Sequence, residues 1–480
     1  MEATVDKFGL RHHMHFRVEC VSASWNEDGF WDVRLRDLMT GTEYARTASI
    51  LVSAVGGISR PRDVKFPGMD TFQGEMFHTA RWNHKYDYRG KRMAVIGNGC
   101  SAAQVVPEVA RQVAHVTQYA RSPQWYHERP NRRFTCFERW CFRHVPLLGR
   151  ILRLRLFLAS DNMVTTYGPG ETATRLRLRA EAHARDYIVS TAPQKYHHLL
   201  VPEFPLGMLR PFVRRDSSPS PPDRSAGCKR RIFDPGYLES LHLPNVELVP
   251  HGIEAIDQTG IVSTDGVKIE FDVIVLATGF DIQRFLAPME VYGRGGRSLS
   301  QQWQESRGAQ AYMGTYVNGF PNFAILFGPN TFPAHNSVLF ASEVQVAFIA
   351  KTLLAPVLDR QLSTVEVKRT AEDQWVSRVH SRLRGGVFEA GCSNWYINSH
   401  GRNSASWPGY AADFWKESLK PQRGVFLKTR QSPWWMWYRA KRWMRTTSWT
   451  AYGILGLLML WMMGGQRSGL GIQSSPRLGV

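Results

Sequence analysis

Apolar residues are spaced along the chain in two ways, one typical of strands and one typical of helices. Short apolar runs that end at a glycine predict strands buried on both faces, and alternating apolar residues predict strands with one buried face. Apolar residues three and four positions apart predict helices. The predicted strands are residues 16–25, 31–35, 49–55, 93–96, 114–120, 246–249 and 271–277, and residues 102–113 form the first clear helix.

The order of these elements indicates the fold class. Residues 93–120 give strand, glycine turn, helix, strand, which is the order of a βαβ unit. Residues 138–204 are rich in Leu, Arg and Ala at helical spacing and predict several helices, whereas serine and proline in residues 216–227 predict a loop. We therefore expect an α/β protein with a helical insertion.

The composition excludes some classes of protein. The 480 residues, of which 43% are apolar, 12% aromatic and 21% charged, suit a globular chain of several domains and not a disordered or fibrous one. The net charge of +19 suits nucleic acid, a membrane surface or a phosphorylated cofactor. No basic tract with interleaved aromatic residues occurs in the main body, so we expect no nucleic-acid partner.

The six cysteines lie far apart and include no C-x-x-C pair. This spacing argues against a zinc site or a disulfide scaffold and favours a reducing compartment. The first residues are charged and lack the apolar segment of a secretory signal. We therefore expect no metal and a cytoplasmic body.

A glycine-rich turn, Gly97-Asn98-Gly99-Cys100-Ser101-Ala102, joins a predicted strand to a predicted helix. The first glycine permits a tight turn, the second lets the backbone approach a pyrophosphate, and the small third residue lets helix and strand pack closely. The phosphates would lie at the positive helix N-terminus. The pattern predicts a dinucleotide site with contacts from Gly97, Gly99, Ser101 and Ala102, and the alternative is a tight turn without a ligand.

The end of the next strand distinguishes between the two nicotinamide cofactors. About 20 residues after the glycines, an acidic residue would bind a ribose 2′-hydroxyl. This chain has Arg121 there, and a guanidinium suits a 2′-phosphate. The sequence therefore favours NADP over NAD, and the alternative is an ordinary surface arginine.

A second motif, Phe72-x-Gly74-x-x-x-His78-x-x-x-Trp82, directly precedes the βαβ unit. A single histidine between aromatic residues is more often a packed core residue than a catalytic one. The whole motif, however, resembles the fingerprint F-x-G-x-x-x-H-x-x-x-W-[P/D] of Baeyer–Villiger monooxygenases, which are class B flavoprotein monooxygenases. Asn83 departs from its last position, while Trp82 distinguishes it from the version in flavin-containing monooxygenases. The resemblance implies that His78 and Trp82 couple the linker between domains to NADP.

Further landmarks extend the resemblance from about Phe8 to Glu417. In chain order they are Ser53-Ala54-Val55-Gly56 with Arg60-Pro61, Ala277-Thr278-Gly279-Phe280-Asp281, Gly328-Pro329-Asn330 with Ser337, Glu343 and Gln345, residues 392–396, and Trp407-Pro408-Gly409. The resemblance implies that Gly279 and Asp281 lie near a cofactor, where the chain returns to the flavin domain.

The run Lys229-Arg230-Arg231 would by itself be a solvated turn. By similarity, Arg230 matches the arginine that faces the flavin in the family, and Lys229 matches its neighbour at the 2′-phosphate. A permanently charged group that does not easily donate its proton suits the negative charge that develops when oxygen is transferred to a ketone. The resemblance therefore makes Arg230 the catalytic residue.

The resemblance implies a two-dinucleotide-binding-domain flavoprotein fold of the α/β class, in which FAD and NAD(P) are bound by Rossmann-like domains. The sequence has no second G-x-G-x-x-G near its start for the FAD pyrophosphate, so we expect an N-terminally truncated version of this fold with altered or incomplete flavin binding. The expected domains are residues 1–71 and 271–430 for FAD, 72–125 and 228–270 for NADP, 126–227 for the helical insertion and mobile loop, and 431–480 for a basic, aromatic tail.

The tail contains an uncharged stretch, residues 446–466. At about 1.5 Å per residue it just crosses a hydrocarbon core of about 30 Å, and its aromatic and basic flank suits a membrane tether with the body in the cytosol. Its strongly apolar centre is shorter, which equally suits a segment that lies in the interface or packs on protein. Both alternatives stay open.

The expected activity is that of an NADPH- and FAD-dependent monooxygenase that uses O2 to insert oxygen beside a ketone, giving an ester or lactone. Similar chains serve secondary-metabolite pathways, including fungal aromatic polyketide routes of the aflatoxin and sterigmatocystin type. Two alternatives are oxygenation of nitrogen or sulfur, and an NADP-binding protein without flavin. The substrate and the oligomeric state lie beyond the sequence.

Overall fold

The computed structural model describes residues 2–129, 131–168, 170–204, 206, 231–359, 362–384, 396–419 and 424–428. The chain divides into two compact units, Met1–Ile349 with Glu366–Leu427, and Ala350–Val365 with Lys428–Val480. The predicted loop at 216–227, the predicted site residues Lys229 and Arg230, and the apolar stretch at 446–466 lie outside the described residues.

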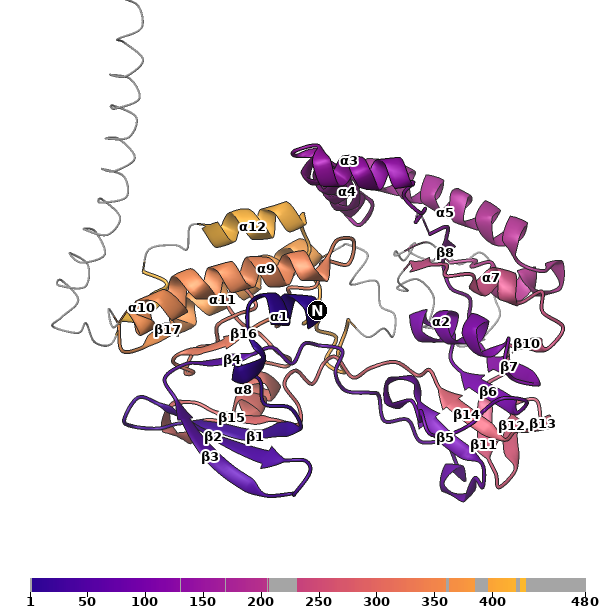
Figure 1. Ribbon diagram of the computed structural model, residues 1–480, viewed down its shortest axis with the longest axis horizontal. Helices are drawn as coiled ribbons and strands as arrows, with labels where there is room; N and C mark the ends of the chain where they lie inside the picture. The colour runs from indigo at the N-terminus through magenta and orange to yellow at the C-terminus, as the bar shows by residue number, and fades with distance from the viewer. Residues whose placement is uncertain are drawn as a thin grey trace, which may run out of the picture. The chain divides into compact units, whose positions relative to one another are not determined.

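A five-stranded parallel sheet in the first unit confirms the predicted βαβ order (Figure 1). Its strands, in spatial order, are β10 (Val246–Val249), β7 (His115–Tyr119), β6 (Arg92–Ile96), β14 (Val273–Leu276) and β5 (Glu75–His78). Helix α2 (Cys100–Val109) connects β6 to β7. Because β14 pairs with both β5 and β6, the sheet extends to Leu276, and the domain boundary predicted between residues 270 and 271 has to move beyond it.

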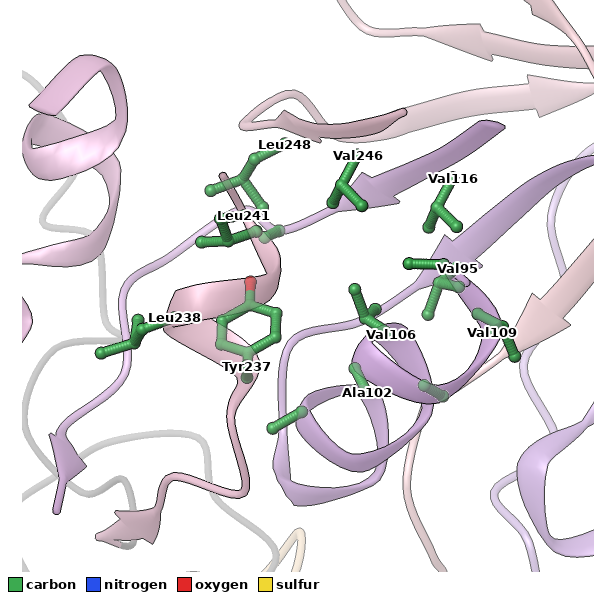
Figure 2. Close-up of a cluster of buried hydrophobic side chains, with 14 of the residues drawn as sticks. Val95, Ala102, Val106, Val109, Val116, Tyr237, Leu238, Leu241, Val246 and Leu248 are labelled. Atoms are coloured by element: carbon green, nitrogen blue, oxygen red, sulfur yellow. The ribbon is translucent and has the colours of Figure 1, made fainter. Parts of the chain in front are cut away.

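The two faces of this sheet are covered by different layers. Successive residues of a strand point to opposite faces, so Val95 joins one apolar cluster and Ala94 joins another. Figure 2 shows the first cluster, in which α2 and α7 (Tyr237–Ser240) bury their apolar side chains against the sheet. The second cluster lies under an antiparallel sheet of β11 (Ile253–Ile256), β12 (Gly260–Ser263) and β13 (Lys268–Glu270). The glycine turn therefore stands on a sheet that is buried on both faces.

A second group of strands lies in the same unit. The four-stranded sheet has the order β15 (Glu290–Tyr292), β1 (Val18–Trp25), β2 (Trp31–Asp37) and β3 (Glu43–Ala48), with β15 parallel to β1. Strand β4 (Leu51–Ser53) pairs in parallel with β16 (Phe323–Ile325). Trp31 joins these parts, since its indole is fully buried and donates to the Pro321 carbonyl at 2.9 Å.

The predicted helical insertion is confirmed. It contains α3 (Cys136–His144), α4 (Leu148–Asn162), α5 (Glu171–Thr191) and α6 (His197–Leu200). A short parallel pair, β8 (Tyr126–His127) and β9 (Ile232–Phe233), lies where the chain enters and leaves it. The end of α5 and α6 pack into the apolar cluster of the parallel sheet through Ile188 and Leu200, whereas α3 and α4 expose large apolar side chains such as Trp140 and Leu154.

The remaining elements are helices and a two-stranded sheet. The helices are α1 (Glu2–Lys7), α8 (Leu299–Glu305), α9 (Val338–Ile349), α10 (Ala355–Leu358), α11 (Arg369–Leu383) and α12 (Ala411–Leu419), with the π-helix Ala350–Leu354 and the 3-10 helices Arg11–His13, Met69–Thr71, Thr79–Arg81, Met163–Thr166, Gln194–Tyr196 and Arg294–Gly296. The strands are β17 (Val365–Val367) and β18 (Phe426–Lys428). Among the described residues, one helical stretch, Val338–Leu358, has the length and apolar composition of a membrane span, a test that core helices of soluble proteins also pass.

Candidate dinucleotide site

Gly97 closes the turn between β6 and α2, and the structure shows why this position is glycine. Its φ of +118° is a backbone conformation that side chains rarely adopt, and a Cβ there would lie 2.5 Å from the Ala277 carbonyl oxygen. The Gly97 N–H donates to the Tyr119 carbonyl at 3.0 Å. The turn is therefore held between the ends of the two strands that flank β6.

Gly99 is the N-cap residue of α2, and its environment differs from that of Gly97. Its φ is −78°, and no atom lies within 4 Å of the position that a Cβ would take. The first N–H groups of a helix lack intrahelical partners, and their partial positive charge binds anions. Ser101 is half-buried in this turn and Ala102 is fully buried against the sheet. The four predicted contacts thus lie on one turn, with open space for a pyrophosphate at Gly99.

A hydrogen-bond network under the turn was missed by the sequence analysis. Gln118 Nε2 donates to the Gly97 carbonyl at 2.9 Å, and the Tyr237 hydroxyl donates to Gln118 Oε1 at 2.8 Å. The Asn98 side chain donates to the Ser122 carbonyl. A glutamine inside a predicted buried strand was the available signal, because buried amides need partners. The network fixes the conformation of the turn.

Arg121 directly follows Ala120 at the edge where β7 and β10 end. The pairing of these strands places Tyr119 opposite Val249. Arg121 Cδ lies 3.8 Å from the position that a Cβ on Gly252 would take, so the arginine stem lies beside the residues that follow β10. The Arg121 side chain is exposed, and its guanidinium is available for a 2′-phosphate at the end of the strand.

His78 is the last residue of β5, and its ring, in one defined tautomer, bonds to Gly279 in the segment that follows β14. The Ala80 N–H donates to Nδ1 at 3.0 Å, so Nε2 carries the proton and donates to the Gly279 carbonyl at 3.1 Å. Burial lowers the pKa of His78, and the charge of Arg81 adds to this, while the bond to Gly279 opposes it. His78 is therefore neutral at pH 7 and acts as a connection between β5 and the end of β14.

Trp82 packs in the same region without a polar role. Its ring stands edge-on to Phe77 at 4.8 Å and to Tyr88 at 5.7 Å between ring centroids. These contacts attach the fingerprint to the apolar cluster on the α2 face of the sheet. A direct contact between Trp82 and a cofactor stays a prediction.

Two linkers between the domains, residues 60–62 before β5 and residues 279–281 after β14, run antiparallel to each other. The Asp281 N–H donates to the Arg60 carbonyl at 2.9 Å, and Pro61 and Phe280 form a β-bridge between these residues. A hollow of about 820 Å³ lies beside the crossing. Its charged lining residues are Arg60, Arg62, Asp63, Asp70, Glu75 and Arg81. Because three of these are basic and three acidic, the lining favours no ligand of a single charge.

Gly328-Pro329-Asn330 lies near the carboxyl end of β16, which pairs in parallel with β4, whereas residues 392–395 of the landmark at 392–396 lie outside the described residues. Asn330 is fully buried and donates to the carbonyls of Asn403 and Ser406 at 3.0 and 3.1 Å. Among the described residues, no partner is found for the buried Asn330 Oδ1 or for Ser53 Oγ at the end of β4. Ligands of parallel sheets bind at this edge. The unpaired acceptor and hydroxyl fit part of a flavin site, whereas a second strand–glycine turn–helix for the pyrophosphate does not occur in this sequence.

Asp161 of α4 joins the helical insertion to the later landmarks. Its buried carboxylate accepts hydrogen bonds from His335 Nε2 at 3.0 Å, Asn336 Nδ2 at 3.1 Å, and the N–H groups of Ala411 and Ala412 at 2.7 and 3.2 Å. Burial alone would raise the pKa of Asp161. The hydrogen bonds from these donors, of which Ala411 is the strongest, lower the pKa by more than burial raises it, so the net shift is downward. The carboxylate therefore stays charged and caps the N-terminus of α12.

Comparison with known proteins supports one family. Residues 2–138 match the family model described as flavin-binding monooxygenase-like. A Baeyer–Villiger monooxygenase of Streptomyces coelicolor is 30% identical over 437 residues, which cover 90% of this chain and 78% of that protein. A Baeyer–Villiger monooxygenase of Pseudomonas aeruginosa is 32% identical over 417 residues, covering 86% and 73%. An FAD-binding monooxygenase of Aspergillus niger is 33% identical over 441 residues, covering 89% and 68%.

Solved structures agree with this result. An oxidized steroid monooxygenase bound to NADP has a TM-score of 0.67 and 26% identity, covering 89% of this chain and 83% of that one. Cyclohexanone monooxygenase from Rhodococcus sp. Phi1, bound to NADP+, has a TM-score of 0.72 at 24% identity with the same coverage, and shares the fold. The fold is thus that of the two-dinucleotide-binding-domain flavoprotein monooxygenases. The chain belongs to the Baeyer–Villiger monooxygenases.

Proposed function

We propose that this chain binds NADPH at the Gly97 turn and, together with FAD, inserts an oxygen atom beside a ketone carbonyl to give an ester or lactone. One observation carries the proposal: the turn leaves Gly99 open above the helix N-terminus, and Arg121 follows the end of β7 at the same edge of the sheet. The N–H groups of the helix N-terminus would bind the pyrophosphate, and the Arg121 guanidinium would bind the 2′-phosphate. Relatives that carry the Baeyer–Villiger name support the reaction type.

The residues of this chain have separate roles in the proposed function. The backbone N–H groups after Gly99 bind the pyrophosphate, and Arg121 with Lys229 binds the 2′-phosphate. His78 holds β5 to Gly279 and thereby fixes the linkers through which the two dinucleotide domains are joined. Arg230 stabilises the negative charge that develops during oxygen transfer.

FAD supplies the oxygen-activating chemistry when bound. The unpaired Asn330 Oδ1 and Ser53 Oγ fit part of a flavin site, and the rest of that site is not defined by the described residues. The first experiment is therefore to incubate the purified chain with FAD, pass it through gel filtration and record the visible spectrum. Flavin bands that stay with the protein support the proposal, and a colourless protein favours an NADP-binding protein without flavin.

The role of Arg230 is tested by Arg230→Ala. Ketone oxygenation should be lost while NADPH oxidation persists, because the charge is needed only in the oxygen-transfer step. Arg111→Ala, an exposed arginine after α2, is the matched control. Equal loss of NADPH oxidation in Arg230→Ala would contradict this role. Oxygenation of amines or sulfides without ketone conversion would favour the alternative reaction.

We further propose a role in secondary metabolism, with a ketone of aromatic polyketide origin as the substrate. The proposal is supported by the resemblance of the sequence to chains of such pathways, and FAD-binding monooxygenases of Aspergillus niger and Aspergillus terreus, 33% and 28% identical to this chain, are fungal relatives. Product analysis of the purified enzyme with aromatic polyketide ketones, against cyclohexanone as a comparison substrate, is the test. Conversion of cyclohexanone alone would contradict it.

A membrane tether at residues 446–466 stays a prediction, which sedimentation of the full chain with vesicles would test.

A further inference from the structure

Helix α4 of the helical insertion exposes an apolar stripe, which consists of Ile151, Leu154 and Leu158. These residues are three and four positions apart, so their side chains lie on one face of the helix. Each of them is between 53% and 55% exposed. Contiguous exposed apolar side chains on a soluble protein mark a surface that docks on something else.

Helix α3, which contacts α4, adds two exposed aromatic rings (Figure 1). Phe137 is 72% exposed and Trp140 is 54% exposed, and their rings are nearly parallel with 6.3 Å between the centroids. A capping box of Thr135 and Glu138 fixes the start of this helix. The rings therefore stand on a formed helix, and tryptophan is enriched where proteins meet the headgroup region of a bilayer.

The charge around these apolar side chains is positive. Residues 132–155 contain seven arginines and one acidic residue, Glu138, which gives a net charge of +6. Glu138 itself pairs with Arg132 at 2.5 Å. On α4, the exposed Arg150 and Arg155 lie about 70° to either side of the apolar stripe, at about 100° per residue. An apolar stripe between two cationic edges is typical of a helix that lies in a membrane interface, with its arginines at the level of the phosphates.

A neighbouring face of α4 attaches the helix to the rest of the protein. The Phe157 ring lies 4.7 Å from the ring of Phe340, between centroids, and Arg153 Nη2 lies 3.4 Å from the Glu343 carboxylate. Asp161, one turn further along, accepts the N–H groups at the start of α12. The apolar stripe is therefore not the face through which α4 packs on the protein, and docking of the stripe leaves these contacts intact.

We propose that the apolar stripe of α4, together with Phe137 and Trp140 of α3, docks the protein on the surface of an anionic phospholipid bilayer. Charge complementarity favours this occupant, because such a bilayer offers negative headgroups above an apolar interior. A second copy of the chain carries a net charge of +19 and would be repelled. Residues 429–480 of the chain contain no acidic residue, so they do not complement the surface either. The proposal is independent of the tether at 446–466 and of the reaction that the protein catalyses.

The test measures binding of the full chain to phosphatidylcholine vesicles by sedimentation, with and without about one-third phosphatidylserine. Since each arginine near an anionic surface contributes about fivefold, the wild type should bind the anionic vesicles at least about tenfold more tightly. Amide hydrogen exchange, read segment by segment in mass spectrometry, then locates the contact. Residues 136–162 should exchange more slowly with anionic vesicles present, whereas residues 18–48 should not change, and a contact through the tail is read separately.

Two double variants separate the apolar part of the surface from the charged part. Leu154→Ser with Leu158→Ser should weaken vesicle binding at least about tenfold and remove the protection of residues 136–162. The matched control is Leu38→Ser with Leu178→Ser, at leucines that are 59% and 48% exposed elsewhere, and it should bind like the wild type.

Arg150→Gln with Arg155→Gln should remove most of the preference for phosphatidylserine, because two of the cationic groups beside the stripe are gone. The control Arg46→Gln with Arg111→Gln changes two other exposed arginines and should keep the preference.

Four results would overturn the proposal. They are absence of vesicle binding, equal binding to both kinds of vesicle, vesicle binding without protection of residues 136–162, and wild-type protection in the Leu154→Ser, Leu158→Ser variant. Protection of residues 136–162 that grows with protein concentration in the absence of vesicles would assign the surface to a second copy of the chain, and would overturn the proposal as well.

Discussion

Replacing each glycine of the turn by alanine separates the folding role of one from the binding role of the other. In Gly97→Ala, the new methyl would lie 2.5 Å from the Ala277 carbonyl oxygen, at a φ of +118°. Left-handed backbone strain costs about 1–3 kcal/mol and overpacking costs a similar amount. We therefore expect a loss of about 2–5 kcal/mol in the free energy of unfolding, together with loss of NADPH binding.

Gly99→Ala is the matched control for this substitution. No atom lies within 4 Å of its new methyl and φ is −78°, so stability should change by less than about 1 kcal/mol. The methyl would instead occupy the space that the pyrophosphate needs. We expect NADPH binding to weaken at least about tenfold, which corresponds to about 1.4 kcal/mol.

Urea unfolding followed by tryptophan fluorescence measures the stability of both variants, and NADPH fluorescence titration measures binding. Gly97→Ala should change both quantities, and Gly99→Ala only the second. An unchanged unfolding midpoint in Gly97→Ala would refute the argument that the end of β14 excludes a side chain there. Full NADPH affinity in Gly99→Ala would refute the placement of the pyrophosphate.

Three further predictions follow from other contacts. Arg121→Ala should abolish the preference for NADPH over NADH in competition binding, while Arg111→Ala retains it; an unchanged preference would move the 2′-phosphate elsewhere. Asp161→Ala should lower the free energy of unfolding by about 3 kcal/mol, because it leaves buried donors unpaired. The control Asp6→Ala removes an exposed carboxylate and should cost less than about 1 kcal/mol. Equal losses in the two variants would contradict the role of Asp161 as a buried connection. Burial lowers the pKa of His127 from 6.5 to about 4, so its contribution to stability is complete above pH 6.5 and is lost as pH falls towards 4. Between pH 7 and pH 5, the free energy of unfolding of the wild type should fall by about 2 kcal/mol more than that of His127→Gln. Parallel curves of unfolding free energy against pH for the two proteins would contradict this.

Local patterns carried most of what the sequence predicted correctly. The βαβ unit at 93–120 was recognised because strand, glycine turn and helix follow one another within 28 residues, and each depends mainly on its neighbours. Boundaries were less accurate for the same reason. The helix predicted at 102–113 is α2 (Cys100–Val109), since Gly99 and not the apolar spacing sets its start. The strand predicted at 49–55 pairs only over Leu51–Ser53, because its partner β16 extends no further.

The amino-acid sequence by itself determined the family, the glycine turn and the identity of Arg121, because these are patterns of residue type at fixed spacing. Tertiary structure alone decided which distant residues meet. It placed β14 between β5 and β6, and Asp161 at the start of α12. Periodicity reports only which side of an element is buried, whereas strand order and packing decide what that side meets.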